Sequence, residues 1–288
     1  AAAPIFTNVD RLDIRSAGEV FISETDGVEF GRSAIASGGE NAGETVTINV
    51  GTGTISSVND SVIFGGDGTL VITSTGDVTL ETALSATNSD IVIATRTLTD
   101  GTPTEDILLE ARNGRVSIIA TAGVGAAGVA DIDIASAEIT STSETGDVAL
   151  ELRASTTVVG AGITIGSGSG SLHVNQISGS LTLNGRVSHY GAGFIDLDVL
   201  LGSLSMTSNG RISTVSGSMD VWVKNNFTLS QVSSTSGKIT LRSQNGSIRT
   251  LSGFGSANIV SSQAASVFVD KIAEFTVNSN LVKVNGFN

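Results

Sequence analysis

The residues best suited to chemistry in this sequence are one histidine and three aspartates that recur at similar spacings. His173, Asp196 and Asp220 are separated by 23 and 24 residues, and Asp198 and Trp222 each lie two positions after one of the aspartates. Neighbouring carboxylates can share a proton or bind a cation, and paired carboxyl groups are the usual equipment of acid–base sugar chemistry. The first three residues are therefore candidate catalytic groups, and Asp198 and Trp222 are candidate binding residues.

A purely structural interpretation of the same residues stays open. Outward positions of strands in an acidic protein often carry aspartate, and one histidine among them needs no function. Solvated aspartates on an exposed ladder also discourage lateral pairing between sheets.

The elements that would position these residues are short strands introduced by glycine. The pattern Gly, any residue, apolar, any residue, apolar begins at Gly18, Gly68, Gly76, Gly114, Gly146, Gly170, Gly179, Gly202, Gly217 and Gly237. Alternation at a period of two is typical of a strand with one buried face, and Gly, Asn, Asp and Ser between such runs are turn formers. The sequence therefore predicts strands joined by tight corners.

The first inward residues of these strands fall into three interleaved series with steps of 19 to 25 residues. The first series is Val46, Leu70, Ile91, Val116, Ile139, Ile163, Val187. The second is Val148, Leu172, Ile195, Met219, Ile239, Ile259, and the third is Val158, Leu181, Leu204, Phe227, Ile248, Val267.

Such a period predicts a solenoid in which each coil stacks on the previous one. The expected fold is all-β, a parallel β-helix: a three-sided β-solenoid with about 23 residues per coil and roughly 12 coils. Residues 1–288 form one domain in this interpretation. Leu172, Ile195, Met219 and Ile239 are expected to stack in its interior. Residues 263–276 are expected to form strand rather than helix, because of their β-branched content.

Composition narrows the possible partners. The chain has 288 residues with a net charge of −13 and no cysteine. The negative charge argues against nucleic acid as a partner, and the absence of a long apolar run argues against membrane insertion. No metal or cofactor motif is convincing, because Leu70 stands where the calcium-binding nonapeptide needs aspartate in GGDGTL. The start, AAAPIF, has the small residues typical of the region left after cleavage of a signal peptide, so we expect secretion. The alternative is that the sequence has been trimmed at this point.

Several strings resemble a known group of proteins. GSLTLNGRVSHYGAG, GKITLRSQNGSIRT and GDVTLETA are similar to repeats of large secreted β-helical surface proteins of bacteria. Filamentous haemagglutinin-like exoproteins and autotransporter passenger domains are the nearest comparison, over most of residues 12–285. The resemblance implies an extracellular or cell-surface role in adhesion or structure.

The expected function is that of a non-enzymatic, secreted structural or adhesive subunit that stacks head-to-tail on copies of itself. Open ends of a solenoid invite such pairing. The residues assigned to the ends are Leu12, Ile14, Val282, Val284 and Phe287. The alternative interpretation of these ends is that flanking sequence continues the rod in a longer protein. The alternative is a β-helix that binds or cleaves polysaccharide, as a lyase or hydrolase, with the acidic face toward surface glycans.

Overall fold

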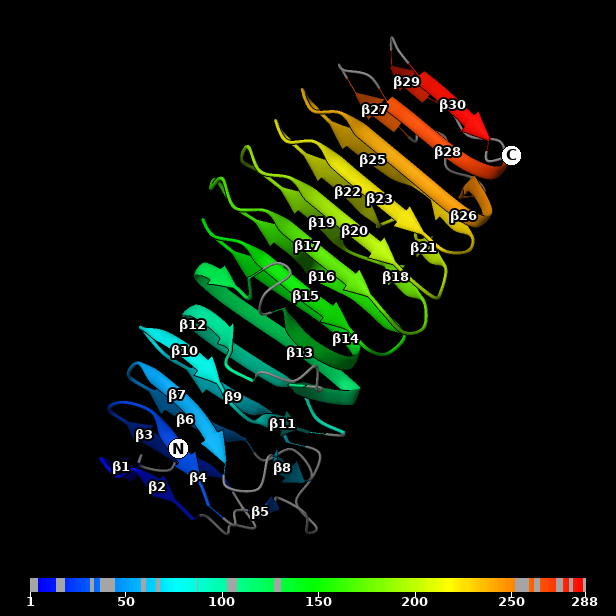
Figure 1. Ribbon diagram of the computed structural model, residues 1–288. Helices are drawn as coiled ribbons and strands as arrows, with labels where there is room; N and C mark the ends of the chain where they lie inside the picture. The colour runs from blue at the N-terminus through cyan, green and yellow to red at the C-terminus, as the bar shows by residue number, and fades with distance from the viewer. Residues whose placement is uncertain are drawn as a thin grey trace.

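The fold is known from a computed structural model. The structure describes residues 5–13, 19–31, 34–36, 45–57, 61–65, 68–86, 88–102, 108–126, 131–251, 259–261, 265–272, 277–279 and 282–286. Throughout these ranges the secondary structure is strand and turn, with no helix, and the strand pairs are parallel. The chain advances from one end of an elongated stack to the other (Figure 1). The predicted parallel β-solenoid is therefore confirmed.

The strands form three faces, which we call the first, second and third face. The first face contains β1 (Ile5–Thr7), β3 (Val20–Glu24), β6 (Val46–Val50), β9 (Leu70–Thr73), β19 (Arg186–His189), β22 (Arg211–Thr214), β25 (Gln231–Ser234), β27 (Ile259–Ser261) and β29 (Val277–Ser279). The second contains β2 (Arg11–Leu12), β4 (Val28–Phe30), β7 (Gly53–Ser57), β10 (Asp77–Leu80), β15 (Val148–Leu152), β17 (Leu172–Gln176), β20 (Ile195–Val199), β23 (Met219–Val223) and β30 (Val282–Gly286). The third contains β5 (Ala34–Ala36), β8 (Ser61–Gly65), β11 (Ala83–Ser85), β18 (Leu181–Leu183), β21 (Leu204–Met206) and β24 (Phe227–Leu229).

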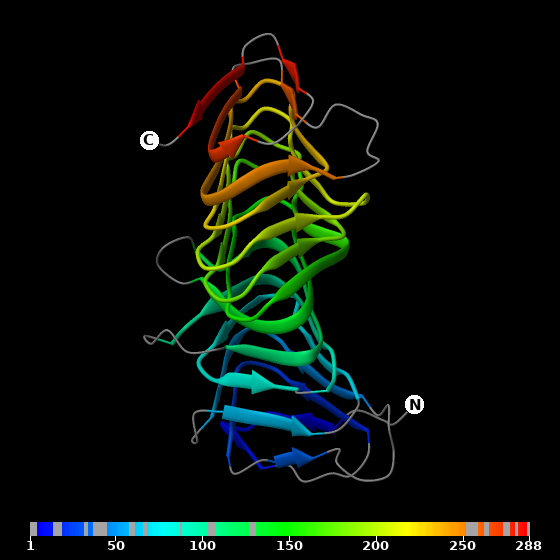
Figure 2. The same ribbon diagram turned by 90° about the vertical axis from the view of Figure 1, so that its right-hand side faces the viewer.

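Longer strands bend around corners and belong to more than one face. They are β12 (Ile91–Asp100), β13 (Leu109–Val124), β14 (Ile132–Ser143), β16 (Thr156–Ile165), β26 (Ile239–Thr250) and β28 (Ala265–Ile272). Figure 2 shows successive coils stacked along the long axis. Three strands per coil are clearest where β17, β18 and β19 pair with β20, β21 and β22, respectively.

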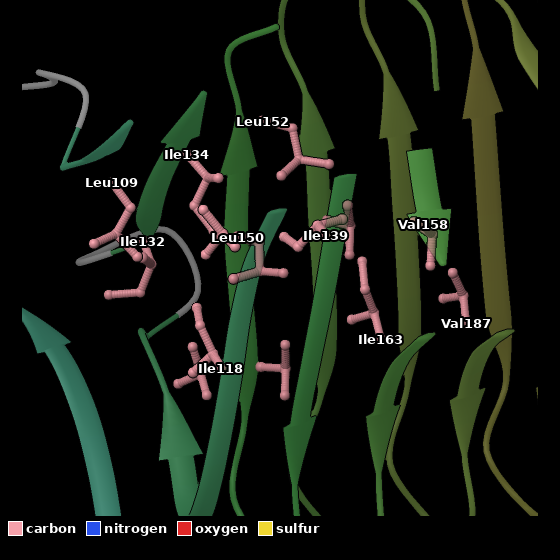
Figure 3. Close-up of a cluster of buried hydrophobic side chains, with 14 of the residues drawn as sticks. Leu109, Ile118, Ile132, Ile134, Ile139, Leu150, Leu152, Val158, Ile163 and Val187 are labelled. Atoms are coloured by element: carbon pink, nitrogen blue, oxygen red, sulfur yellow. The ribbon is translucent and has the colours of Figure 1, made fainter. Parts of the chain in front are cut away.

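The interior is filled by aliphatic side chains from alternate positions of each strand. Leu172, Ile195 and Ile239 are fully buried and Met219 is 1% exposed, and the four pair in register as predicted. Figure 3 shows the same arrangement further along the rod, where Ile118, Ile139, Leu150 and other aliphatic residues fill the space between the sheets. Burial of these side chains supplies the main stabilisation, at about 25 cal/mol for each Å² of apolar surface removed from water.

A stack of glycines at one corner explains the repeated Gly-x-apolar-x-apolar motif. Gly146, Gly170, Gly193, Gly217 and Gly237 lie on successive coils. A Cβ at Gly193 would lie 1.8 Å from the Gly170 carbonyl oxygen, and one at Gly217 would lie 1.6 Å from the Gly193 carbonyl oxygen. The coils approach too closely at this corner for any side chain, so the glycine is a packing requirement.

At β14, the two neighbouring coils place their strands on different faces. We call this arrangement, which involves residues 132–165, the strand exchange. On one side of β14, Leu109 pairs with Ile134 on the third face and Val116 pairs with Ile139 on the first. On its other side, Ile134 pairs with Leu152 of the second-face strand β15. The two halves of β16 lie beside the rest of β14 and continue into β18 and β19. Val158, at the start of the third face in the later coils, therefore pairs with Ile139, which belongs to the first face in the earlier coils.

At four places, the three predicted series name the wrong neighbour on the next coil. Ile139 pairs with Val158 rather than Ile163, and Ile163 pairs with Ser141. The remaining three steps place a residue beside the wrong strand or at the wrong position: Val158 pairs with Leu183 rather than Leu181, Ile259 with Val232 rather than Ile239, and Val267 with Leu241 rather than Ile248. The physical reason is that corners vary in length, so a residue count alone does not identify the neighbouring strand.

The segment 263–276 agrees with the expectation of strand where the structure describes it. Residues 265–272 form β28, which pairs with β26 and β30.

Candidate functional site

The second face carries the predicted candidate residues in two outward columns. The first column is Ala149, His173, Asp196, Asp220, Thr240, and the second is Glu151, Asn175, Asp198, Trp222, Arg242. Each strand alternates, so the aspartates of β20 point outward because Ile195, Leu197 and Val199 point inward. Adjacent strands in a sheet lie about 4.8 Å apart, which brings these polar side chains into mutual range.

His173 and Asp196 form the first interacting pair. The His173 Nδ1 atom lies 3.6 Å from Asp196 Oδ2, and both side chains are partly exposed. The Asp196 carboxylate raises the pKa of His173 above its usual value, against the opposing effect of burial, and Asp131 and Asp147 add weaker attraction. The imidazolium form is therefore stabilised by the negative charge around it.

Asp198 is the most strongly perturbed titratable group of the face. Partial burial raises the pKa of Asp198 to about 6, and repulsion from Asp196 and Asp220 acts in the same direction. Near pH 6 this carboxyl group holds its proton about half of the time, which suits a general acid.

Asp220 has a cationic partner on the next coil. The Arg242 guanidinium donates a hydrogen bond of 2.9 Å to Asp220 Oδ2, while Asp220 Oδ1 is buried without a hydrogen-bond donor. Burial raises the pKa of Asp220, and Arg242 opposes that shift. Trp222 lies half-buried between Asp198 and Arg242 in the second column, so part of its indole remains open to a ligand.

A second charged cluster extends the second column beyond Glu151. Arg153 Nε donates to Asp133 Oδ1 at 2.9 Å, and the Nη2 atom of the same guanidinium group forms an ion pair with Glu151. Asp133 pairs directly with Glu151 across β14 and β15, and burial raises the pKa of Asp133. Sequence reasoning missed this cluster, because only the strand exchange places β14 beside β15.

His189 was also missed, although the alternation contains its signal. Val187 points inward, so the residue two positions later should do the same, and His189 is fully buried. Its Nδ1 accepts a hydrogen bond of 2.9 Å from the Gly191 N–H, and its Nε2 lies 2.5 Å from the Gly170 carbonyl oxygen. Nε2 therefore carries the proton, and the ring ties two coils together at the glycine corner.

The predicted end residues are only partly described. Leu12 packs against the core from β2, and Val282 and Val284 pair with Ala265 and Val267 through the backbone of β30. Ile14 and Phe287 lie outside the described residues. At the N-terminal end, Ile5 and Phe6 of β1 are 61% and 78% exposed, an apolar patch that the sequence interpretation did not single out.

Within the described residues, no group of three or more potential ligand side chains has the arrangement needed to hold a metal ion. No helix in these ranges is long and apolar enough to cross a membrane.

Compared with protein-family models, with curated proteins and with solved structures, the chain matches none of them.

Proposed function

We propose that this protein is a secreted structural or adhesive β-solenoid whose rods join end to end. The observation that carries the proposal is the one-sided pairing of its terminal strands. Within the described residues, β1 and β2 pair only with β3 and β4, and β29 and β30 pair only with β27 and β28. The outer edges of these terminal strands have no strand partner among the described residues, and an unpaired strand edge is a template for another strand.

Two further features support this proposal. The exposed Ile5 side chain is in register with the inward residue Ile22, so it adds apolar surface at the N-terminal end, where stacking on another coil would bury it. The contact would join two different ends, and such a head-to-tail contact does not close, so it generates a filament. The absence of cysteine and the resemblance to secreted β-helical surface proteins support an extracellular location.

Negative-stain electron microscopy and light scattering of the purified chain test end-to-end assembly. We expect filaments or concentration-dependent growth for the wild type, and shorter species for Ile5→Lys and Val284→Lys. Leu201→Lys is the matched control, because Leu201 is 65% exposed on a side corner of the rod. A wild type that stays monomeric at high concentration would contradict the proposal.

A second function is favoured by the two outward columns of the second face. A histidine, three aspartates and a partly exposed tryptophan on adjacent strands form a surface suited to polysaccharide, either for binding or for acid–base cleavage. In this function Trp222 stacks on a sugar ring, Asp198 donates a proton, and Asp196 with His173 accepts one.

Glycan arrays and a reducing-end assay test this second function. Trp222→Ala should abolish retention of any bound glycan, whereas Tyr190→Ala, at an exposed aromatic residue on another part of the surface, should not. Asp198→Asn should abolish any cleavage while it leaves binding in place. Absence of glycan binding by the wild type would reject both forms of this function.

A further inference from the structure

A hollow of about 450 Å³ opens on the second face beside the candidate columns. It lies where β12 and the end of β13 meet the turns that precede β15 and β17, at the glycine corner. The lining residues come from four consecutive coils and are mostly hydroxyl side chains and glycines, among them Thr97, Thr99, Gly123, Thr145, Asp147 and Ser169. Pockets of about 300 to 1,000 Å³ are typical of small-molecule and cofactor sites.

Glycine residues in the middle coil create the hollow. Thr97 pairs with Gly123, so the position that carries a hydroxyl side chain on one coil carries none on the next. A Cβ placed at Gly123 would make only ordinary van der Waals contacts, the nearest with the Asp147 carbonyl oxygen at 3.5 Å, so a side chain could begin there without a clash. The later glycines of the same corner are closed off by backbone at much shorter distances. Among the described residues, no side chain occupies this position of the face.

The polar groups that line the hollow are mostly acceptors. Thr97 donates its hydroxyl hydrogen to Asp77 Oδ1 at 2.5 Å, and Thr145 donates to the Thr121 carbonyl oxygen at 3.1 Å. Thr99 is engaged with Thr79 at 2.9 Å. One oxygen of Asp147 accepts the Ser171 N–H at 2.6 Å, which leaves the other oxygen for a ligand. The hollow therefore suits a ligand that brings hydroxyl donors.

Charge restricts the ligand further. Of the described residues that line the hollow, none is a lysine or an arginine, and Asp147 contributes a negative charge. An anionic group such as a phosphate, a sulfate or a uronate would meet repulsion without a cationic partner. An uncharged sugar residue supplies several hydroxyl donors and no negative charge.

The hollow and the candidate columns lie on the same face, within a short distance along the axis. Val124, Val148, Leu172, Ile195 and Met219 lie in one inward ladder, so the coil of Gly123 is four coils from the strand that carries Trp222. The coil of Gly170, at the near edge of the hollow, is two coils from that strand. At about 4.8 Å per coil these separations are roughly 19 and 10 Å along the axis. Both features face outward on the second face, with His173 and the aspartates between them.

We propose that the hollow is a subsite for an uncharged sugar residue of a linear glycan that lies along the second face and reaches Trp222. This inference rests on the glycan-binding function proposed above and names its ligand. A peptide fits less well, because its carbonyl groups would need donors that the threonine hydroxyls have already committed to the protein.

The test compares variants of two exposed serines from the same turn. Ser169 lines the hollow and Ser167 does not, so Ser169→Phe fills the subsite and Ser167→Phe is its matched control. Binding of neutral oligosaccharides of increasing length and of uronate oligosaccharides is measured by calorimetry. Thermal melts followed by circular dichroism establish that each variant is folded.

We expect wild type and Ser167→Phe to bind long neutral oligosaccharides equally. Ser169→Phe should weaken that binding at least tenfold and leave short oligosaccharides unaffected, while Trp222→Ala should weaken both. If Trp222→Ala loses binding and Ser169→Phe does not, the glycan face stands and the subsite is wrong. A preference for uronates, or binding of peptides in place of glycans, overturns the inference. If the wild type binds no glycan, the glycan function itself fails, and this inference fails with it.

Discussion

Asp198→Asn should stabilise the protein at neutral and alkaline pH and leave it unchanged in acid. The pKa of Asp198 is raised to about 6 in the folded state, from an ordinary value of 3.8. The folded state therefore holds a proton that the unfolded state releases between about pH 4 and 6. Below this window the neutral carboxyl group carries no penalty, and above it the ionised group costs the fold stability.

The magnitude follows from the size of the shift and from exposure. About two pKa units correspond to a ceiling of about 3 kcal/mol at pH 8. Asp198 is only half-buried, so solvent and salt screen much of the repulsion, and about 1 kcal/mol is the expected net effect. The melting temperature of Asp198→Asn should then rise by about 2 °C at pH 8, given the usual scaling for a chain of this length.

Thermal denaturation of wild type and Asp198→Asn at pH 4, 6 and 8 measures this difference directly. Asp26→Asn is the matched control, because it removes the same charge from an exposed turn far from the acidic columns. A carboxyl-carbon NMR titration would report the pKa of Asp198 itself. Equal stabilisation at pH 4 and pH 8, or a loss of stability at pH 8, would refute the electrostatic reasoning.

Three further predictions concern the core, the corner and the histidine of the acidic face. Ile195→Asp should destabilise the protein by about 4 kcal/mol or more, because it buries an unpaired carboxylate in an aliphatic ladder, and an unchanged urea midpoint would show that the ladder is wrong. Gly217→Ala should lower the melting temperature markedly, because its Cβ would lie 1.6 Å from the Gly193 carbonyl oxygen, whereas Ser216→Ala in the same turn should change it little. The pKa of His173 is raised, so its protonated form stabilises the fold below its usual pKa of 6.5, and this contribution is lost as the pH rises through the raised value. His173→Gln should therefore lower stability at pH 6 and not at pH 9, which melts at the two pH values would decide.

The alternation of apolar residues predicted the inward and outward faces well. The ladder from Leu172 to Ile239 and the outward neighbours His173, Asp196 and Asp220 all follow from it, because a period of two assigns each side chain to one face. Their common face could be predicted in the same way. The perturbed pKa of Asp198 could not, because it depends on partial burial and on charges from two other coils.

The strand exchange was beyond the reach of the sequence pattern. Val158 and Ile163 both satisfy the alternation, and either could follow Ile139 at an acceptable spacing. What decides is the bulge between the halves of β16, where Gly160 and Gly162 have φ values of +55° and +85°. The hollow at Gly123 could not be predicted for a related reason. The sequence does not show whether a Cβ at a corner glycine would clash with the neighbouring coil or have room.

The strand exchange also separates coils that are structurally equivalent, and could replace one another, from coils that are not. Removal of residues 172–194 would bring Ile195 beside Val148, and the strands that follow would occupy the places of β18 and β19, because each step preserves the same three pairings. Rods of different length could thus arise by loss or duplication of whole coils in this part of the chain. A deletion within residues 132–165 would not keep every strand on its own face. This segment therefore has to be retained, whereas the number of coils on either side of it can change during evolution.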